Sequence, residues 1–261
     1  MMQYTPKLPD DSVNVSRQRP LLTAVKLTAA LAVLALVGYL LMGAVIDLAV
    51  ASVTPQQERK LASALSLDMP YRESNSSYLK QLTQRLTQCA DLPYSIRVAV
   101  VKEKEPNAFA VPGGMIVITS GILSKMQSEN ELAFIIGHEL GHFKHRDHLR
   151  ALGYRIVLGA ISLMLGSDYG AASSMTLGIS SARYSQSAEL AADRYGLEVM
   201  QCAYGTVSDA TRIFEKMRSG YEWQYFMATH PGFETRIKQM RLHIRERGYD
   251  TTRTPLPLGK I

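Results

Sequence analysis

The stretch SENELAFIIGHELGH, residues 128–142, decides how the rest of the chain is interpreted. His138 and His142 stand four residues apart, so on a helix their imidazoles lie on one face and can bind the same metal ion. Glu139 follows the first of them, at the position from which a carboxylate reaches a metal-bound water. The apolar residues before the motif indicate a buried helix, in which unpaired imidazoles would be costly. We therefore expect a catalytic metal site in which His138 and His142 are ligands and Glu139 activates water.

A catalytic zinc ion usually has three protein ligands and one position for water, so the site needs a third ligand. His148 stands where an HExxHxxGxxH pattern has its last histidine. That pattern needs a glycine at position 145 to break the helix, and this chain has His145 there. On an unbroken helix, His148 would lie about 15 Å along the axis from His138 and could not share its metal. The spacing therefore argues against His148 as a ligand.

Glu189 is the better candidate for the third ligand. It lies in SAELAADRYG, residues 187–196, where it precedes Asp193 by four residues on a predicted helix and so shares its face. Glu189 can complete a site of two histidines and one glutamate. Asp193 can accept a hydrogen bond from the other ring nitrogen of a ligand histidine, which fixes the tautomer and orientation of that ring. Without HELGH, the two acids would be interpreted as the surface of an amphipathic helix.

The soluble part of the chain predicts a small sheet joined to a larger helical body. Strands are predicted at 94–101 and at Met115–Thr119, because both stretches are rich in β-branched residues and are bounded by turn residues. Ser128, with a glutamate three residues later, fits the capping box that starts a helix. From there the pattern stays helical almost to Gly248. These elements predict an α+β fold that is mainly helical.

An apolar segment, LTAALAVLALVGYLLMGAVI at residues 27–46, precedes this domain. It is uncharged, lies between Lys26 and Asp47, and matches as a helix the roughly 30 Å hydrocarbon core of a bilayer. It therefore predicts one transmembrane helix. Ala49 and Ala51 form the A-x-A pattern of a signal-peptide cleavage site, but the apolar run is too long and begins too late for a signal peptide.

Basic residues are more frequent before the predicted span than just after it. Those before it are Lys7, Arg17, Arg19 and Lys26, and those that follow closely are Arg59 and Lys60. Because basic residues favour the cytoplasmic side, this bias places the N-terminus in the cytoplasm. We therefore expect a single-pass protein of the cell inner membrane whose catalytic domain is periplasmic or otherwise extracytoplasmic.

Composition limits the other function classes. With 46% hydrophobic residues the chain can bury a sizeable core. The net charge of +6 would suit nucleic acid, but the basic residues are scattered and lack a platform of aromatic side chains, so we expect no nucleic-acid partner. Cys89 and Cys202 fit no thiolate zinc site and are either two buried thiols or one disulfide in an oxidising compartment. The apolar, glycine-interrupted region 156–180 is interpreted as a helical hairpin or lid near the active site, in preference to a second membrane segment.

With these motifs in their order, the chain resembles the HtpX and CaaX-prenyl-protease type of zinc peptidases, which are gluzincins, and particularly their compact bacterial membrane-anchored members. The resemblance covers about Pro106 to Arg247 and is carried by PNAFAVPGG (106–114), HELGH, the ExxxD pair of Glu189 and Asp193, and HPGFETR (230–236). It implies a zincin-like fold and one Zn²⁺ per chain. The roles that it implies are metal ligation by His138, His142 and Glu189, general base catalysis by Glu139, orientation by Asp193, approach to the metal by His230, and support of His230 or Asp193 by Arg236.

The resemblance also implies an activity. We expect a membrane-anchored zinc endopeptidase that acts on protein or peptide substrates in the quality control of misfolded or misassembled proteins. The alternative is a membrane-tethered chaperone or assembly factor whose zinc only stabilises the fold. The expected segments are a cytoplasmic tail (1–26), a transmembrane anchor (27–53), the zinc metallopeptidase domain (54–247) and a C-terminal tail (248–261).

Two further expectations concern the substrate. His230 either donates a hydrogen bond to the developing oxyanion or serves as a fourth ligand that displaces the water until substrate arrives. The segment PNAFAVPGG predicts an exposed strand edge, against which an extended substrate backbone pairs. The residues expected to form this substrate edge are Asn107, Phe109, Ala110 and Val111. An ordinary edge strand that ends in a turn is the alternative for this segment.

Overall fold

The structure is a computed structural model that describes residues 19–65, 71–93, 95–164, 184–217, 223, 226 and 230–261. The chain divides into two compact units, residues 1–47 and 48–261. Of the region that was interpreted as a hairpin or lid, only 156–164 belongs to the described residues, and the rest of that prediction lies outside them.

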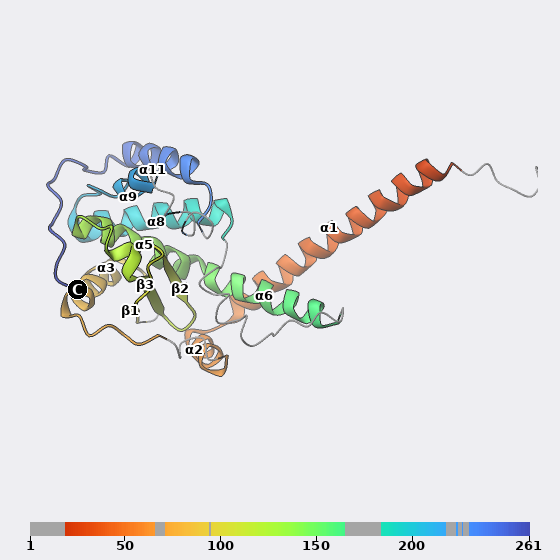
Figure 1. Ribbon diagram of the computed structural model, residues 1–261, viewed down its shortest axis with the longest axis horizontal. Helices are drawn as coiled ribbons and strands as arrows, with labels where there is room; N and C mark the ends of the chain where they lie inside the picture. Colours follow the sequence, from red (N-terminus) through yellow and green to blue (C-terminus); the bar gives the residue numbers. More distant parts are fainter. Residues whose placement is uncertain are drawn as a thin grey trace, which may run out of the picture. The chain divides into compact units, whose positions relative to one another are not determined.

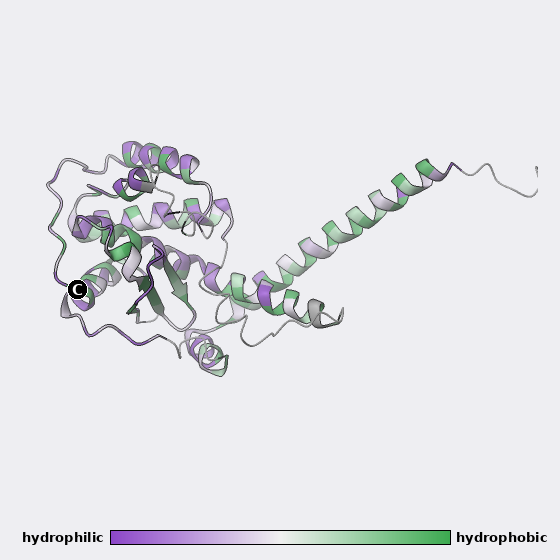
Figure 2. Ribbon diagram, viewed as in Figure 1, coloured by the Kyte–Doolittle hydropathy of each residue, from purple (hydrophilic) through white to green (hydrophobic). Residues whose placement is uncertain are grey.

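The first described element is the helix α1, Pro20–Ser52 (Figure 1). Among the described residues it is the one helix long and apolar enough to cross a membrane, and an 18-residue window of it has a mean hydropathy of 2.5. Apolar residues occupy most of its length, as Figure 2 shows. At about 1.5 Å per residue, a helix of this length exceeds the hydrocarbon core of a bilayer. The prediction of an N-terminal apolar helix is confirmed.

The sheet has three strands, β1 (Arg97–Val101), β2 (Ala108–Val111) and β3 (Met115–Thr119), in the order β1-β3-β2. β3 is parallel to β1 and antiparallel to β2. The strand predicted at 94–101 is shorter than expected, because Arg97 already pairs with Met115, the first residue of β3, and no residue of β3 remains to pair with the positions before it. Gly113 and Gly114 adopt positive φ in the β2–β3 turn, a conformation that glycine tolerates best.

Helices make up most of the second unit (Figure 1). They are α2 (Pro55–Ala64), α3 (Ser77–Cys89), α4 (Ser120–Leu123), α5 (Glu129–His145), α6 (Asp147–Met164), α8 (Gln186–Tyr204), α9 (Arg212–Met217) and α11 (Phe233–Arg247). The predicted start of α5 is confirmed, since Ser128 Oγ accepts a hydrogen bond from the Glu131 amide at 3.3 Å. The capping box is only half formed, because the Glu131 carboxylate accepts from the Gln127 amide instead. A mainly helical α+β fold with a small sheet is confirmed.

The helices α5 and α8 pack closely against each other. Glycines at 137 and 141 of α5 face Gly196 and Ala192 of α8. A Cβ atom added at Gly141 would lie 2.7 Å from the Ala192 Cα atom, so only glycine allows the two backbones to approach this far. This approach matters for the site, because α5 carries HELGH and α8 carries Glu189.

Candidate metal centre

Three side chains predicted as ligands converge between α5 and α8. His138 and His142, one turn apart on α5, have their Nε2 atoms 3.1 Å from each other. Glu189 lies in the first turn of α8, with its Oε2 atom 3.5 Å from His138 Nε2 and its Oε1 atom 3.5 Å from His142 Nε2. All three side chains are buried. Two imidazoles and a carboxylate in this arrangement are typical of a catalytic zinc site.

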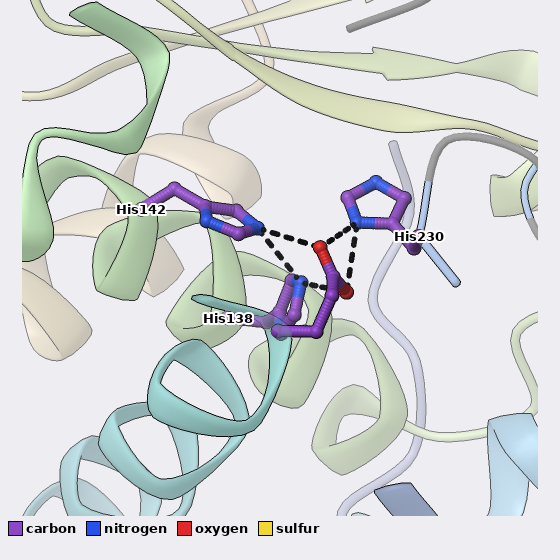
Figure 3. Close-up of side chains that lie close together, drawn as sticks. His138, His142 and His230 are labelled. Carbon is purple, nitrogen blue, oxygen red and sulfur yellow. Dashed lines mark hydrogen bonds and ion pairs between the residues drawn. The ribbon is translucent and has the colours of Figure 1, made fainter. Parts of the chain in front are cut away.

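His230 joins these three side chains from a distant part of the sequence (Figure 3). Its Nδ1 atom lies 3.2 Å from both carboxylate oxygens of Glu189, and its Nε2 atom lies 3.3 Å from the Ala108 carbonyl oxygen. One ligand atom from each of the four residues lies within 4.8 Å of the others. His230 is therefore placed between the candidate ligands and the strand β2.

The surroundings of the Glu139 carboxylate indicate whether a metal ion fits this site. Both carboxylate oxygens of Glu139 are buried and have no hydrogen-bond partner among the described residues. A buried carboxylate without a partner is costly, unless a ligand or a metal-bound water meets it. The buried set of imidazoles and carboxylate next to it matches the ligands that zinc prefers. The residues present therefore fit a divalent metal ion such as zinc.

Asp193 and Arg236 hold the ring of His138 from its far side. Asp193 Oδ1 lies 2.9 Å from His138 Nδ1, and Arg236 donates to both oxygens of Asp193 at 2.6 and 2.7 Å. Burial alone would raise the pKa of Asp193, but the charge and hydrogen bonds of Arg236 outweigh burial and lower it. An ionised Asp193 accepts the Nδ1 proton of His138, which leaves the Nε2 lone pair directed at Glu189 and the metal position.

His142 has its own carboxylate partner, which the sequence reasoning missed. Asp147 Oδ2 lies 3.0 Å from His142 Nδ1, and the ring of Tyr184 stacks on the imidazole with the two centroids 3.9 Å apart. Asp147 follows His142 by five residues, which would place it on a different face of a continuous helix. No spacing rule points to Tyr184, because it lies outside both motifs. Both residues are buried and fix the orientation of His142.

The premise of an unbroken helix beyond HELGH was wrong. α5 ends at His145, and Arg146 adopts the left-handed conformation with φ of 59° before α6 begins at Asp147. The break turns Asp147 toward His142. It also turns His148 toward Glu58, whose Oε1 atom lies 3.0 Å from His148 Nε2. His148 is not in the cluster of candidate ligands that the described residues form.

The two histidines of α5 have opposite pKa shifts. Burial lowers the pKa of His138 below its usual value. Burial would lower that of His142 too, but its hydrogen bonds with Asp147 and Glu189 outweigh burial and raise the pKa to about 10. Burial likewise opposes ionisation of Glu189, yet the charges of His230 and Arg236 hold the pKa of Glu189 well below its usual range. Glu189 is therefore ionised, and a metal ion that binds His142 displaces a proton from its ring.

The predicted substrate edge is less open than expected. β2 is the outermost strand of the sheet that the described residues form. The segment is nevertheless buried, with exposed fractions of 1% for Asn107, 4% for Phe109, 2% for Ala110 and 0% for Val111. Phe109 and Val111 pack in one apolar cluster and Ala110 in another, on the two faces of the sheet. The segment is therefore buried where an exposed strand edge was predicted. The pairing of a substrate backbone with this outer strand stays a prediction, and the Ala108 carbonyl oxygen lies next to His230.

Comparisons with known proteins show which sequences this chain resembles. A sequence model of peptidase family M48 matches residues 73–244, well over half of the chain. The chain is 38% identical over 96 residues to a "Protease HtpX homolog" of Thermodesulfovibrio yellowstonii, an alignment that covers 35% of this chain and 33% of that protein. It is 26% identical over 190 residues to a "Putative beta-barrel assembly-enhancing protease" of Vibrio cholerae, with 66% and 39% of the two chains covered.

A third relative is the "Mitochondrial metalloendopeptidase OMA1" of Arabidopsis thaliana, which is 29% identical over 148 residues. That alignment covers 55% of this chain and 30% of the relative. The alignments thus cover about a third of the length of each of these three relatives.

Proposed function

The chain belongs to peptidase family M48, and from this premise we propose that it is a membrane-anchored, zinc-dependent endopeptidase. One observation carries the proposal. The ligand atoms of His138, His142 and Glu189 converge in a buried site, near a Glu139 carboxylate that has no partner among the described residues. A zinc site that only stabilised the fold would have no need of that additional buried carboxylate, since such sites are usually closed by four ligands.

The proposed mechanism assigns a role to each side chain. His138, His142 and Glu189 hold the zinc ion, which when bound makes water more acidic and polarises the substrate carbonyl. Glu139 removes a proton from the attacking water and delivers it to the leaving amine. Asp193 and Arg236 keep the ring of His138 oriented, as Asp147 does for His142.

His230 is proposed to act on the substrate side of the centre. Its Nε2 atom faces the Ala108 carbonyl oxygen and its Nδ1 atom faces Glu189, so the ring lies between the strand and the candidate ligands. In the presence of substrate, we propose that His230 donates a hydrogen bond to the oxyanion that forms from the scissile carbonyl. In its absence, the position of Nδ1 among the ligand atoms suits a fourth ligand that keeps the enzyme latent.

The proposed substrates are unfolded or misassembled proteins. β2 is an outer strand next to the centre, and an extended backbone that pairs with such a strand is selected by shape more than by side chains. The segment must open for this pairing, since its residues are buried. The Vibrio cholerae relative is named a putative beta-barrel assembly-enhancing protease, and this name supports a role in protein quality control.

The proposed location is the cell inner membrane, with α1 as a single-pass anchor and the catalytic domain outside the cytoplasm. α1 has the length and hydropathy for this role, and the basic residues before it favour a cytoplasmic N-terminus. Cys89 and Cys202 form a disulfide between α3 and α8. Because disulfides persist in oxidising compartments, this bond supports a domain that faces the periplasm.

Digestion of an unfolded protein by the purified full-length chain tests the proposal. We expect hydrolysis of casein that a chelator abolishes and added zinc restores. Glu139→Gln should retain its zinc, by elemental analysis, while the rate of hydrolysis falls by about 10² to 10⁴, the usual contribution of a general base. Glu198→Gln, which changes a partly exposed carboxylate on α8 outside the cluster, is the matched control and should keep full activity. Unchanged hydrolysis in Glu139→Gln, or activity that survives the chelator, would contradict the proposal.

A further inference from the structure

The second half of α6 is an exposed apolar segment that the proposed chemistry does not use. Residues 156–164 read IVLGAISLM, and the charged residues of α6 all precede them. The side chains of Ile156, Leu158, Ile161 and Met164 are 40, 52, 44 and 86% exposed. Elsewhere in the described part of the second unit, large exposed apolar side chains occur singly, at Leu48, Leu242, Leu256 and Ile261. Single exposed apolar residues are ordinary, whereas a contiguous group marks a surface that binds something.

These side chains do not form a narrow stripe. With a turn of about 100° per residue, Met164, Ile161 and Leu158 lie at roughly 80°, 140° and 200° from Ile156 around the helix. An amphipathic helix that docks in a protein groove presents one apolar stripe and keeps its other face polar. Here the apolar side chains spread over more than half of the circumference, and Figure 2 shows the last turns of α6 without a hydrophilic face. That distribution suits a medium that surrounds the helix on several sides.

The start of α6 is fastened to the segment in which the chain leaves α1. Arg146, the residue just before α6, donates from Nη1 to the carbonyl oxygens of Val50 and Val53 at 2.6 and 2.7 Å. Carbonyl groups at the end of a helix lack partners within it, and a guanidinium satisfies them well. If the apolar part of α1 spans the membrane, Val50 and Val53 lie just beyond the surface of the bilayer. The 18 residues of α6 are about 27 Å long, so the end of the helix is within reach of that surface.

We propose that residues 156–164 of α6 insert into the lipid leaflet from which α1 emerges. Nine helical residues extend about 14 Å, roughly half of the hydrocarbon core, so the segment enters one leaflet and does not cross the bilayer. Lipid accounts for the spread of apolar side chains around α6, because acyl chains surround a helix on all sides. Lipid is also close by, because Arg146 holds the start of α6 near the membrane. The inference rests on the proposed anchoring by α1 and is independent of peptidase activity.

The test uses the full-length chain in vesicles of phosphatidylcholine and phosphatidylglycerol. A cysteine for an environment-sensitive fluorophore replaces Leu158 in α6, Leu34 in α1 or Leu242 in α11, one at a time. Cys89 and Cys202 are bonded to each other, so the introduced thiol is the one that reacts. Leu242 is an exposed leucine outside α6 and serves as the matched control. Lipids that carry a doxyl quencher should reduce the emission of the probes at Leu34 and Leu158 and leave that of the probe at Leu242 unchanged.

The outcomes separate this inference from the anchoring that it rests on. Quenching at Leu34 without quenching at Leu158 would overturn the insertion of α6 and leave the anchor in place. Quenching at neither position would overturn both. A probe at Leu158 that reports an apolar environment but is not quenched by doxyl lipid would show that protein covers α6, either a second copy or a substrate, and would also overturn the inference. Met164→Cys, at the most exposed of the four positions, repeats the measurement should Leu158→Cys fold poorly.

Discussion

At the scale of single residues, His142 is the most constrained part of the candidate centre. Asp147 bonds its Nδ1 atom, Tyr184 stacks on its ring, and His148 approaches its main-chain carbonyl at 3.2 Å. Burial raises the pKa of Tyr184 well above its usual value, so the stacked phenol remains neutral. A ligand ring that is held in one tautomer and one rotamer loses little entropy when it binds a metal.

Asp147→Asn should weaken zinc binding by about 10- to 100-fold, because the partners behind ligand histidines usually contribute that much to affinity. The neutral amide no longer stabilises the Nδ1 proton of His142. Competition with a chromophoric chelator measures the dissociation constant. Asp91→Asn is the control. It removes an exposed carboxylate that binds Lys144 near the end of α5, the helix that carries His142, and it should leave the affinity for zinc unchanged. Equal affinities in wild type and Asp147→Asn would show that Asp147 does not support the site.

Glu58 and His148 form a buried pair that joins three elements. Glu58 Oε1, on α2, accepts from the Gly113 amide in the β2–β3 turn at 2.8 Å and lies 3.0 Å from His148 Nε2 on α6. Burial alone would raise the pKa of Glu58. The hydrogen bond and charge of His148, together with the Gly113 amide, outweigh burial and lower the pKa. The pair therefore links α2, the helix that follows the proposed anchor, to the β2–β3 turn and to the first turn of α6.

Glu58→Gln should destabilise the fold in a manner that depends on pH. Because the pKa of Glu58 in the folded state lies below its ordinary value of 4.5, the ionised carboxylate stabilises the fold above pH 4.5. That stabilisation is lost as the pH falls through the folded-state pKa. The difference in free energy of unfolding between wild type and variant should be largest at pH 7 and shrink in acid, as denaturant unfolding at a series of pH values can measure. A difference that stays constant with pH would contradict the assignment.

At the scale of elements, the spacing between α5 and α8 determines whether a metal site exists. The ligands come from both helices, and Gly137, Gly141 and Gly196 let the backbones approach. An added Cβ at Gly196 would lie 3.0 Å from the His138 amide nitrogen. Packed interiors do not absorb such a change by compression, so the helices would have to separate.

Gly141→Ala should lower the free energy of unfolding by about 1–3 kcal/mol and also lower the zinc content. Its Cβ atom would meet the backbone of Ala192 at 2.7 and 2.9 Å, which a side-chain rotation cannot relieve. Gly159→Ala is the matched control, since nothing lies within 4 Å of an added Cβ there. Alanine is the better helix former, so the control should be neutral or more stable by up to about 1 kcal/mol. A Gly141→Ala protein with normal zinc content and stability would show that the approach of the helices is not required.

At the scale of the whole molecule, the disulfide closes a long loop. Cys89 ends α3 and Cys202 lies near the end of α8, 113 residues apart in sequence. The loop between them contains the sheet, HELGH and Glu189. A cross-link over such a distance restricts the unfolded chain strongly and so favours the folded state.

Replacement of both cysteines by serine should lower the free energy of unfolding by about 2–5 kcal/mol, the usual cost of losing a native disulfide. Denaturant unfolding of the two proteins measures the difference. Reduction of the wild-type protein should produce a similar loss, while the reductant should not change the stability of the double variant. Equal stability of the oxidised wild type and the variant would show that the bond contributes nothing to the fold.

Local patterns were enough to predict several features of this protein. An i, i+4 histidine pair lies on one helical face wherever that helix is placed, and hydropathy alone identifies an apolar helix such as α1. The small sheet and the mainly helical body also followed from periodicity and turn residues, although β1 is shorter than expected. These features depend on interactions between residues that are close in sequence, which is why the order of amino acids is sufficient to determine them.

Tertiary structure decided the features that depend on residues distant in sequence or on one unusual backbone angle. The left-handed conformation of Arg146 turns Asp147 toward His142 and His148 toward Glu58, and no helical pattern predicted that turn. The pairing of the cysteines and the burial of β2 likewise follow from how elements pack. Periodicity determines which face of a helix is apolar, but the partner of each side chain is fixed only when close packing brings separate segments together.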